Sequence, residues 1–403
     1  MTVAGSLAQS LLCSRWLRLM VVGLDLPAHA STIAAVSGAT RGKPECLSAT
    51  VRGTRSMPAV PTDRVKSTIV GSLPKPGWLA APGELFPPWR LEGDRLNEGQ
   101  EDAVRVWIAA QEHAGLDTVT DGEQRRRHYI WGFFQGLDGI DMLNLAMRAQ
   151  RAQRYHKEIA AARLISGPEY RGPIFVDALR ATLAVASKPV KVTLPGPMTI
   201  VDSLVDTIGG RSEAQLAMRF AELLNLEARA LAAAGAAVIQ FDEPCFNVYV
   251  DKVKDWGVAA LERACEGVAA TKAVHICYGY GTPDVKRWKS ANQDWSHYQH
   301  TLPLLAKSSI DQVSIETAAS GVDVSVIEAI RGKDVLLGVV DVGNEAVETA
   351  ETVAQRLHRA LRHIDPGHLY ACTDCGMLPL SRRAAEGKLR ALAEGAALVN
   401  AAL

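Results

Sequence analysis

From Val65 onward, short runs of β-branched and other apolar residues alternate with longer stretches in which Leu, Ala and Val recur every three or four positions. The short runs have the length of buried strands, and the longer stretches have the spacing of amphipathic helices. The predicted strands are Ser67–Ser72, Leu116–Glu123, Val190–Leu194, Ala236–Glu243, Ala273–Cys277, Asp311–Glu316, Asp334–Val342 and Leu369–Cys375. The predicted helices are Gly99–His113, Ser212–Ala234, Val253–Thr271, Val324–Arg331, Glu351–His363 and Ser381–Glu394.

Strands that alternate with helices pair in parallel through right-handed crossovers, and eight such units close into a barrel. The predicted fold is therefore α/β, a (β/α)8 TIM barrel that occupies residues 61–403 as one catalytic domain. The interval between the second and third predicted strands is too long for a simple connection. We expect residues 124–188 to form an inserted helical segment over the C-terminal mouth of the barrel.

The first 60 residues differ from the rest of the chain. Residues 27–60 are rich in Ala, Ser, Thr, Gly and Pro and show neither helical nor strand periodicity. The apolar stretch before them is interrupted by Arg15 and Arg18 and is shorter than the roughly 20 apolar residues that a membrane span needs. We expect residues 1–60 to be a disordered or misassigned extension, in which case Met57 would be the true start; an organelle transit segment is the alternative.

Composition and charge narrow the class of protein. The 403 residues are 48% hydrophobic, and 44 basic side chains balance 44 acidic ones. Nucleic-acid binders carry a basic excess, which this chain lacks, so we expect no nucleic-acid partner. Because the N-terminal apolar stretch is too short to span a membrane, we expect no membrane partner either. The seven cysteines are an odd number spread over a long chain, which does not fit a secreted disulfide framework and favours the reducing cytoplasm.

The chemically unusual residues stand at the ends of the predicted strands, where barrel enzymes build their active sites. They are Ser72, Asp121 with Glu123, Asp242 with Glu243, His275 with Cys277, Glu316, Asp341, and Cys372 with Cys375. A purely structural protein has no reason to concentrate acids, thiols and imidazole at these places. The pattern therefore predicts an enzyme.

His275 and Cys277 form a candidate metal half-site. They are two residues apart on a predicted strand, so both side chains face the same side, with Cα atoms roughly 6.6 Å apart, a span that one zinc ion can bridge. Cys375 would face them across the mouth, and Glu316 offers an oxygen that could fill or vacate the fourth position. The alternative for the half-site is a core histidine beside a small buried thiol. Cys372 points to the opposite face from Cys375 on an extended strand, so we expect it to pack.

Paired acids supply the candidate substrate contacts. Asp242 leaves an apolar run at the mouth, where its carboxylate can accept hydrogen bonds from a substrate ammonium. Glu243 has two open roles, a second substrate contact or a structural cap. The Asp121–Glu123 turn has the same form, and the Arg125–Arg127 run after it indicates a solvated charged surface. The turn over residues 70–76 exposes N–H groups that suit a substrate carboxylate.

Jointly, these segments resemble the C-terminal catalytic barrel of the cobalamin-independent methionine synthase family, over about Ser67 to Leu403. The matching motifs are Val-Gly-Ser-Leu-Pro at 70–74, Asp-Gly-Glu at 121–123, Pro-Gly-Pro-Met-Thr at 195–199, Gln-Phe-Asp-Glu-Pro at 240–244, His-Ile-Cys at 275–277, Ser-Ile-Glu at 314–316 and Asp-Cys-Gly at 374–376. The resemblance implies a zinc-dependent methyltransferase that methylates the thiol of L-homocysteine to make L-methionine.

The resemblance also implies roles for individual residues. It places Zn²⁺ on His275, Cys277, Glu316 and Cys375. Of these, His275, Cys277 and Cys375 would act catalytically by activating the thiol through the metal. Homocysteine would be held by Ser72, Glu123 and Asp242.

Two departures from the long enzymes of the family bear on the methyl donor. Those enzymes join two barrels, whereas this chain has one and looks closest to the short, single-barrel core methionine synthases of the MesD type, which are thought to work with a separate partner protein. After the seventh strand, Asp-Val-Gly-Asn-Glu at 341–345 lacks the histidine thought to be the proton donor in the long enzymes. The donor is therefore open among a methylated folate, a methyl-corrinoid and a small molecule supplied through a partner.

Two other activities are kept as alternatives. The first is a zinc-dependent thiol alkyltransferase of the epoxyalkane:coenzyme M type, and the second is a metal-free barrel like uroporphyrinogen decarboxylase. The acids Glu123 and Asp242 argue against the first, because a sulfonate thiol without an amine has no use for them.

Overall fold

The computed structural model describes residues 63–84, 86–154, 158–292 and 294–403. The extension predicted for residues 1–60 lies outside the described residues. Within the described part of the chain, no helix has both the length and the apolar character to cross a membrane.

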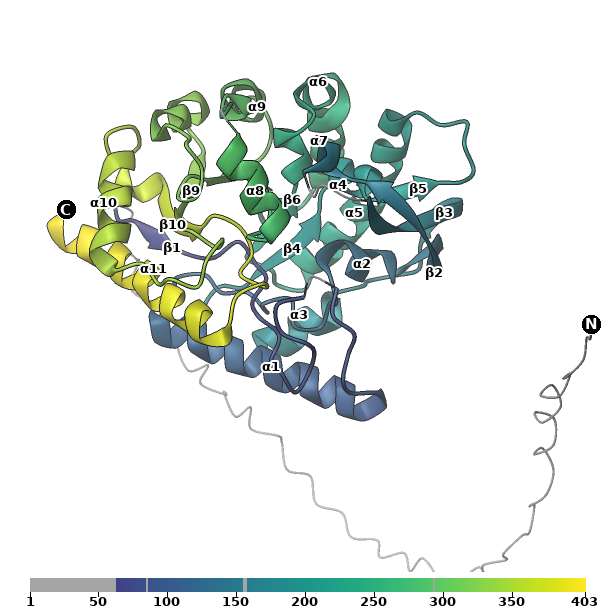
Figure 1. Cartoon of the computed structure of the whole chain (residues 1–403), viewed down its shortest axis with the longest axis horizontal. Helices are drawn as coiled ribbons and strands as arrows, with labels where there is room; N and C mark the ends of the chain where they lie inside the picture. The colour runs from purple at the N-terminus through teal and green to yellow at the C-terminus, as the bar shows by residue number, and fades with distance from the viewer. Residues whose placement is uncertain (1–62, 85, 155–157, 293) are drawn as a thin grey trace, which may run out of the picture. The chain divides into compact units, whose positions relative to one another are not determined.

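A curled sheet of parallel strands lies at the centre of the fold (Figure 1). Its strand order is β1-β10-β9-β8-β7-β6-β4, and every pairing in it is parallel. The strands are β1 (Lys66–Ser67), β4 (Lys191–Pro195), β6 (Val238–Asp242), β7 (Thr271–Ile276), β8 (Gln312–Glu316), β9 (Asp334–Val340) and β10 (Leu369–Thr373). Every residue of β4, β6, β8 and β10 is buried, as expected for strands covered on both faces. The predicted α/β class with a parallel sheet is confirmed.

The predicted strand Leu116–Glu123 forms no regular strand, but it bonds to both edges of the sheet. The N–H of Thr118 donates to the carbonyl of Ser67 in β1 (3.2 Å). On the other side, the N–H of Lys191 in β4 donates to the carbonyl of Val119 (2.8 Å), within a single parallel bridge to Val190. This segment therefore lies between β1 and β4.

Side chains explain why this segment pairs so briefly. The carboxylate of Asp117 accepts the N–H of Ser67 (2.8 Å), and the Gln111 side-chain amide bonds both the N–H and the carbonyl of Thr120 (3.0 and 2.8 Å). Buried backbone groups need partners, and here side chains supply them in place of a strand ladder.

The helices lie outside the sheet (Figure 1). They are α1 (Gly93–Ala114), α4 (Pro197–Asp202), α5 (Glu213–Ala233), α6 (Val250–Lys252), α7 (Val258–Cys265), α8 (Pro283–Ala291), α9 (His297–Ala306), α10 (Ala350–Ala360) and α11 (Arg382–Ala402). Predictions for α1, α5, α10 and α11 are confirmed within a few residues at most ends. Helix α5 begins directly after Ser212, the predicted first residue, because Ser212 and Gln215 form a reciprocal capping box.

Other helix predictions need correction. The expected helix Val253–Thr271 is a π turn over Val253–Gly257 followed by α7, and Val324–Ile330 is a 3-10 helix. Helices α8 and α9 were not predicted. Both are rich in polar and aromatic residues, so their apolar spacing is weak.

Most of the regular secondary structure in the inserted segment is β-structure. Strands β2 (Leu137–Ala149) and β3 (Glu158–Tyr170) pair antiparallel, and β3 pairs in parallel with β5 (Leu204–Asp206). Among the described residues of 124–188, only α2 (Tyr129–Phe134) and α3 (Val176–Leu183) are α-helical. The prediction of a helical insertion over residues 124–188 is therefore wrong. Ala, Leu and Met favour helices intrinsically, but cross-strand pairing overrides this weak preference, even though most residues of β2 are exposed or half-buried.

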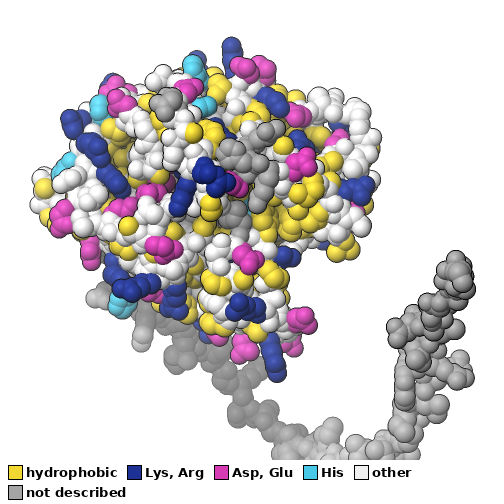
Figure 2. All heavy atoms as spheres, viewed as in Figure 1, with side chains coloured by type: hydrophobic (Ala, Val, Ile, Leu, Met, Phe, Trp, Pro, Cys, Tyr) yellow, Lys and Arg dark blue, Asp and Glu magenta, His cyan; other side chains and the backbone are white. Residues whose placement is uncertain are grey.

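Charged side chains are mixed over the face shown in Figure 2, with Lys and Arg interspersed among Asp and Glu. No large field of one sign covers that face. This distribution agrees with the balanced composition.

Candidate metal and substrate site

The parallel register brings the chemically unusual residues to one rim of the sheet. Asp242 at the end of β6 lies opposite His275 in β7, and His275 lies opposite Ser314 in β8. Because the strands are parallel, the residues that follow these pairs leave the sheet on the same side. The rim therefore carries Asp242, His275 and Cys277 side by side, with Glu316 ending the neighbouring strand.

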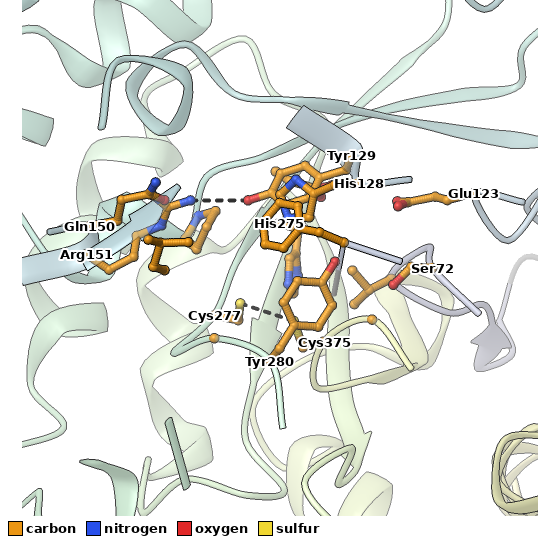
Figure 3. A pocket seen from close by; sticks show the side chains of 17 residues that line it. Ser72, Glu123, His128, Tyr129, Gln150, Arg151, His275, Cys277, Tyr280 and Cys375 are labelled. Carbon is orange, nitrogen blue, oxygen red and sulfur yellow. Dashed lines mark hydrogen bonds between the residues drawn. The ribbon is translucent and has the colours of Figure 1, made fainter. Parts of the chain in front are cut away.

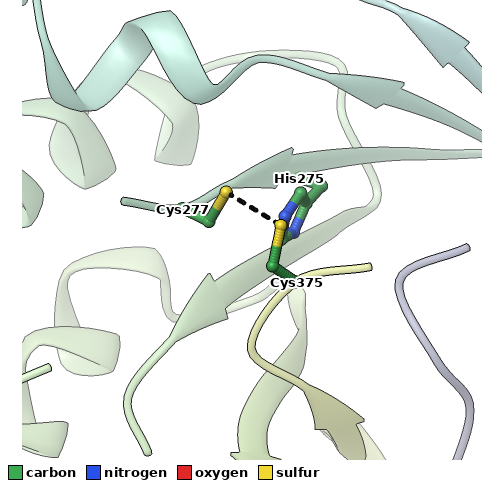
Figure 4. Close-up of side chains that lie close together, drawn as sticks. All are labelled: His275, Cys277 and Cys375. Atoms are coloured by element: carbon green, nitrogen blue, oxygen red, sulfur yellow. Dashed lines mark hydrogen bonds between the residues drawn. The ribbon is translucent and has the colours of Figure 1, made fainter. Parts of the chain in front are cut away.

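His275, Cys277 and Cys375 form a buried group whose ligand atoms all lie within 4.8 Å of one another. The two sulfurs are 3.6 Å apart (Figure 4). Ser314 Oγ lies 2.9 Å from Nδ1 of His275 and fixes the ring, while the buried Nε2 has no oxygen or nitrogen partner among the described residues. One imidazole and two thiols form a donor set suited to a catalytic zinc ion, and the Ser314 hydroxyl fixes the orientation of the imidazole ring.

The three side chains differ in how readily they take the form that binds metal, which is a neutral imidazole or a thiolate. The hydrogen bond between Cys277 and Cys375, together with the nearby His275 ring, holds the pKa of Cys277 well below its usual value. The same hydrogen bond raises the pKa of Cys375. Burial lowers the pKa of His275, but the Cys277 thiolate outweighs this effect and raises it overall. A thiolate, the form that binds metal, is therefore already stabilised here.

Cys372 takes no part in this group. It is fully buried in a small apolar cluster with Val70, Leu336 and Tyr370. The prediction that Cys372 packs while Cys375 faces the site is confirmed.

Glu316 lies close to the metal group but is held by other partners. Its side chain is fully buried, its Oε1 is 2.6 Å from the Lys289 ammonium, and its Oε2 accepts the N–H of Tyr278 (3.0 Å). It is not among the three residues whose ligand atoms cluster within 4.8 Å. Its role as the fourth ligand stays a prediction.

A pocket opens beside the metal group (Figure 3). It encloses about 660 Å³ of space not filled by atoms, part of it open to solvent. The structure brings together the sequence-predicted residues Ser72, Glu123, Asp242, His275, Cys277 and Cys375 along its wall. The same wall includes residues that sequence reasoning missed, namely Phe86, His128, Tyr129, Gln150, Arg151 and Tyr280.

Glu123 is held in a strained backbone conformation. Its φ is +59°, directly after Gly122 at +62°, and left-handed backbone costs a non-glycine residue roughly 1–2 kcal/mol. The hydroxyl of Thr193 donates to its carboxylate (2.9 Å). Such strain is typical of functional sites, because the surrounding structure must support it.

Ser72 lies against the loop that carries Cys375. A Cβ added to Gly376 would lie 2.0 Å from the Ser72 hydroxyl, so the residue after Cys375 must be glycine for the two turns to approach. The motifs Gly-Ser-Leu-Pro and Asp-Cys-Gly therefore meet at one wall of the pocket.

The two acids at 242 and 243 have separate environments. Burial raises the pKa of Asp242 to about 7, and its Oδ1 accepts a hydrogen bond from the Gln240 amide (2.8 Å). Glu243 points away from the pocket and accepts the N–H groups of Met198 and Thr199 (both 2.9 Å) at the start of α4. A side chain at Gly196 would collide with this carboxylate. Of the two open roles for Glu243, the cap is the one observed.

The interpretation of Arg125–Arg127 as a solvated run is wrong for Arg126. Its side chain is only 4% exposed, its guanidinium donates to the Thr193 carbonyl (2.7 Å), and it stacks over the Phe175 ring. It also contacts Asp121. Arg126 thus holds the turn that presents Glu123.

Replacing Arg126 with Met is expected to destabilise the fold by about 3 kcal/mol, because it leaves buried hydrogen-bond acceptors unpaired. A lower urea midpoint in circular dichroism would report this loss. Arg125→Met is the matched control: its guanidinium pairs with the half-exposed Glu101, so a change within about 1 kcal/mol is expected. Equal midpoints for the two variants would contradict the structural role of Arg126.

Four of the six missed pocket residues lie in the inserted segment: His128 and Tyr129 at the start of α2, and Gln150 and Arg151 between β2 and β3. Arg151, between β2 and β3, pairs with Asp202 at the end of α4, and its backbone N–H donates to the same carboxylate (3.0 Å). This contact holds the hairpin against the rim. Nothing in the local pattern indicated it, because the two residues are 51 positions apart.

Comparisons with known proteins identify the family of this chain. Residues 66–398 match the family model described as the catalytic domain of cobalamin-independent synthase. The chain belongs to the cobalamin-independent methionine synthase family. Among its curated relatives in that family, the methionine synthase of Saccharolobus solfataricus is 30% identical over 349 residues, covering 85% of this chain and 96% of that protein. The methionine synthase of Sulfurisphaera tokodaii is 28% identical over 345 residues, covering 85% and 94%.

Solved structures of methionine synthases share the fold. A B12-independent methionine synthase from Shewanella sp. W3-18-1, in complex with selenomethionine, is 42% identical with a TM-score of 0.82, covering 84% of this chain and 98% of that one. A structure described as a B12-independent methionine synthase from Listeria monocytogenes is 18% identical with a TM-score of 0.59, and it supports the fold alone. This chain matches nearly the full length of these relatives.

Proposed function

We propose that this protein is an S-methyltransferase that methylates the thiol of L-homocysteine to form L-methionine, with a zinc ion held by His275, Cys277 and Cys375. The observation that carries the proposal is the buried His-Cys-Cys group in the wall of a pocket that also presents Ser72, Glu123 and Asp242. Family membership supports the reaction, and the Shewanella relative was solved with the selenium analogue of methionine.

The residues around the pocket would bind different groups of the substrate. The carboxylates of Asp242 and Glu123 would hold the substrate ammonium, and the Ser72 turn would hold its carboxylate. When bound, zinc would supply a Lewis acid that lowers the pKa of the substrate thiol. The substrate sulfur gives up its proton to solvent and attacks the methyl carbon in line, so that the S–C bond forms as the bond between that carbon and the donor breaks and the donor leaves with the electron pair. Orientation and exclusion of water are then the protein's main contributions.

We further propose that the sheet closes into a (β/α)8 barrel through residues 117–120, and that residues 61–403 form one catalytic domain. Backbone bonds from this segment to both β1 and β4 support closure. A cytoplasmic location is supported by the five free cysteines among the described residues, which a reducing compartment maintains. The methyl donor and a separate partner protein stay predictions.

The proposal is tested with metal analysis and product detection on the whole protein. We expect about one zinc per chain, and methionine from homocysteine when methyltetrahydrofolate, methylcobalamin or a cell extract is supplied as donor. Proton release on adding homocysteine should exceed that on adding coenzyme M. Equal responses would favour the alkyltransferase alternative, and a protein without metal would favour the metal-free barrel.

Homocysteine binding should weaken as the pH falls below about 7. Burial raises the pKa of Asp242 to about 7, and only its ionised form pairs with the substrate ammonium. Below that pH the protonated fraction grows, so the KM for homocysteine should rise by nearly tenfold per pH unit. The KM measured between pH 5.5 and 8.5 checks this, with Asp242→Asn as the control. If that variant keeps the same acidic limb, another group is responsible.

A further inference from the structure

Lys289 reaches from α8 to the edge of the metal group. Its side chain is only 10% exposed, and its ammonium lies 2.6 Å from Oε1 of the fully buried Glu316. The same ammonium donates to the carbonyl of Gly279 (3.4 Å), two residues beyond Cys277. The cation is thus anchored between the loop after β7 and the end of β8.

Glu316 is held at its backbone and at both carboxylate oxygens, Oε2 by a hydrogen bond and Oε1 by the ion pair with Lys289, without a hydrogen bond to Oε1 among the described residues. Oε2 accepts the N–H of Tyr278 (3.0 Å), and the Glu316 N–H donates to the Tyr298 hydroxyl (2.9 Å), which itself donates to the Ile276 carbonyl (2.8 Å). A carboxylate with both oxygens engaged can coordinate a metal only by weakening one of these contacts. The ion pair with Lys289 is the strongest of them.

The sheet register places Glu316 next to the metal group. Strands β7 and β8 pair at Ile276 and Ile315, so Glu316 follows one residue after that pair, as Cys277 does. The Glu316 carboxylate is close enough to Cys277 for the charges of the two groups to interact. The Lys289 ammonium lies within reach of the same carboxylate.

We propose that Lys289 competes with the bound metal for Glu316, and so keeps one coordination position available to the substrate thiol. This inference rests on the proposed function. With Glu316 paired to Lys289, one imidazole and two thiolates balance the charge of a divalent ion, and an incoming substrate thiolate meets a neutral centre. With Glu316 on the metal, the centre would be anionic and would repel that thiolate. Lys289 is therefore a positioning residue.

Four variants isolate the contact: Lys289→Met, Lys289→Arg, Glu316→Gln and the double variant Lys289→Met/Glu316→Gln. Removing the ammonium alone leaves a buried carboxylate without its cation, which is unfavourable, so that carboxylate should turn to the metal. Zinc affinity of Lys289→Met should then rise about ten- to a hundredfold, the size of effect seen for groups that orient ligands. The double variant should return to within about threefold of wild type, and Lys289→Arg should resemble wild type because the positive charge is kept.

Metal affinity and ligand number are measured without turnover. Zinc affinity comes from competition with a chromophoric chelator, and the visible spectrum of the Co²⁺-substituted protein reports ligand number and type. Lys289→Met should show a changed resting spectrum, and homocysteine should bind it about tenfold or more weakly than wild type, judged by the sulfur-to-cobalt band. Circular dichroism and thermal melting confirm that each variant is folded.

Two results would overturn the role of Lys289. One is a folded Lys289→Met protein whose zinc affinity and cobalt spectrum equal those of wild type. The other is a Glu316→Gln protein that binds zinc tenfold or more weakly than wild type, since Glu316 would then be a ligand despite Lys289. Failure of the proposed function looks different: wild type would bind no stoichiometric metal, or homocysteine would leave its cobalt spectrum unchanged.

Discussion

The Cys375→Ala protein is expected to lose stoichiometric zinc and to transfer methyl groups at least about a thousandfold more slowly than wild type. Cys375 supplies one of the three clustered ligand atoms, and its sulfur lies 3.6 Å from that of Cys277. Loss of a metal that lowers the thiol pKa removes several kcal/mol of transition-state stabilisation, which corresponds to three or more powers of ten in rate. Metal content by mass spectrometry and single-turnover methionine formation measure the two effects.

Cys372→Ala is the matched control. This cysteine is three residues away and equally buried, but it packs against Val70, Leu336 and Tyr370. We expect full zinc content and near-normal activity, with a stability loss of about 1 kcal/mol for the lost packing. If Cys372→Ala loses the metal and Cys375→Ala keeps it, the assignment of the two thiols is reversed.

The second large effect is expected for Asp242→Asn, which should raise the KM for homocysteine about a hundredfold while the metal stays bound. Asp242 is nearly buried in the pocket wall, where a carboxylate paired with an ammonium contributes 2–5 kcal/mol by truncation, about 30- to 5,000-fold. Asparagine keeps the shape and can still accept from the Gln240 amide. The loss therefore reports charge and not packing.

A substrate lacking the amino group sharpens this test. For 4-mercaptobutyrate, which keeps the thiol and carboxylate of homocysteine, wild type should bind far more weakly than it binds homocysteine. Asp242→Asn should lose most of that preference. A variant that discriminates between the two thiols as well as wild type does would show that the ammonium is held elsewhere, for instance by Glu123 alone.

The sequence predicted which polar residues follow the strands, because strand positions depend on local apolar runs. It also predicted that these residues lie together, because the C-terminal ends of parallel strands share one rim. Strands β4, β6, β8, β9 and β10 lie where their apolar runs predicted them. Parallel pairing then places the residues that follow each run on a common rim, which is why Asp242, His275 and Cys277 could be grouped without coordinates. The opposite faces of an extended strand likewise separated Cys372 from Cys375.

The inserted segment shows where this reasoning fails. Its Ala- and Leu-rich composition favours helix, yet strands β2 and β3 pair with each other there, and β3 also pairs with β5, which lies outside residues 124–188. Arg126 was misinterpreted for the same reason. Its burial depends on the Thr193 carbonyl and the Phe175 ring, 67 and 49 residues away, which no local charge pattern reveals.

The sequence by itself determined the α/β class and predicted a metal site on His275, Cys277, Glu316 and Cys375, because short-range periodicity and strand polarity control which residues reach the rim. Only the tertiary structure decided what surrounds that group: the hairpin residues over the pocket, the capping role of Glu243, and the pairing of Glu316 with Lys289. These depend on long-range contacts between buried charged groups, whose partners are selected by the packed fold and not by their neighbours along the chain.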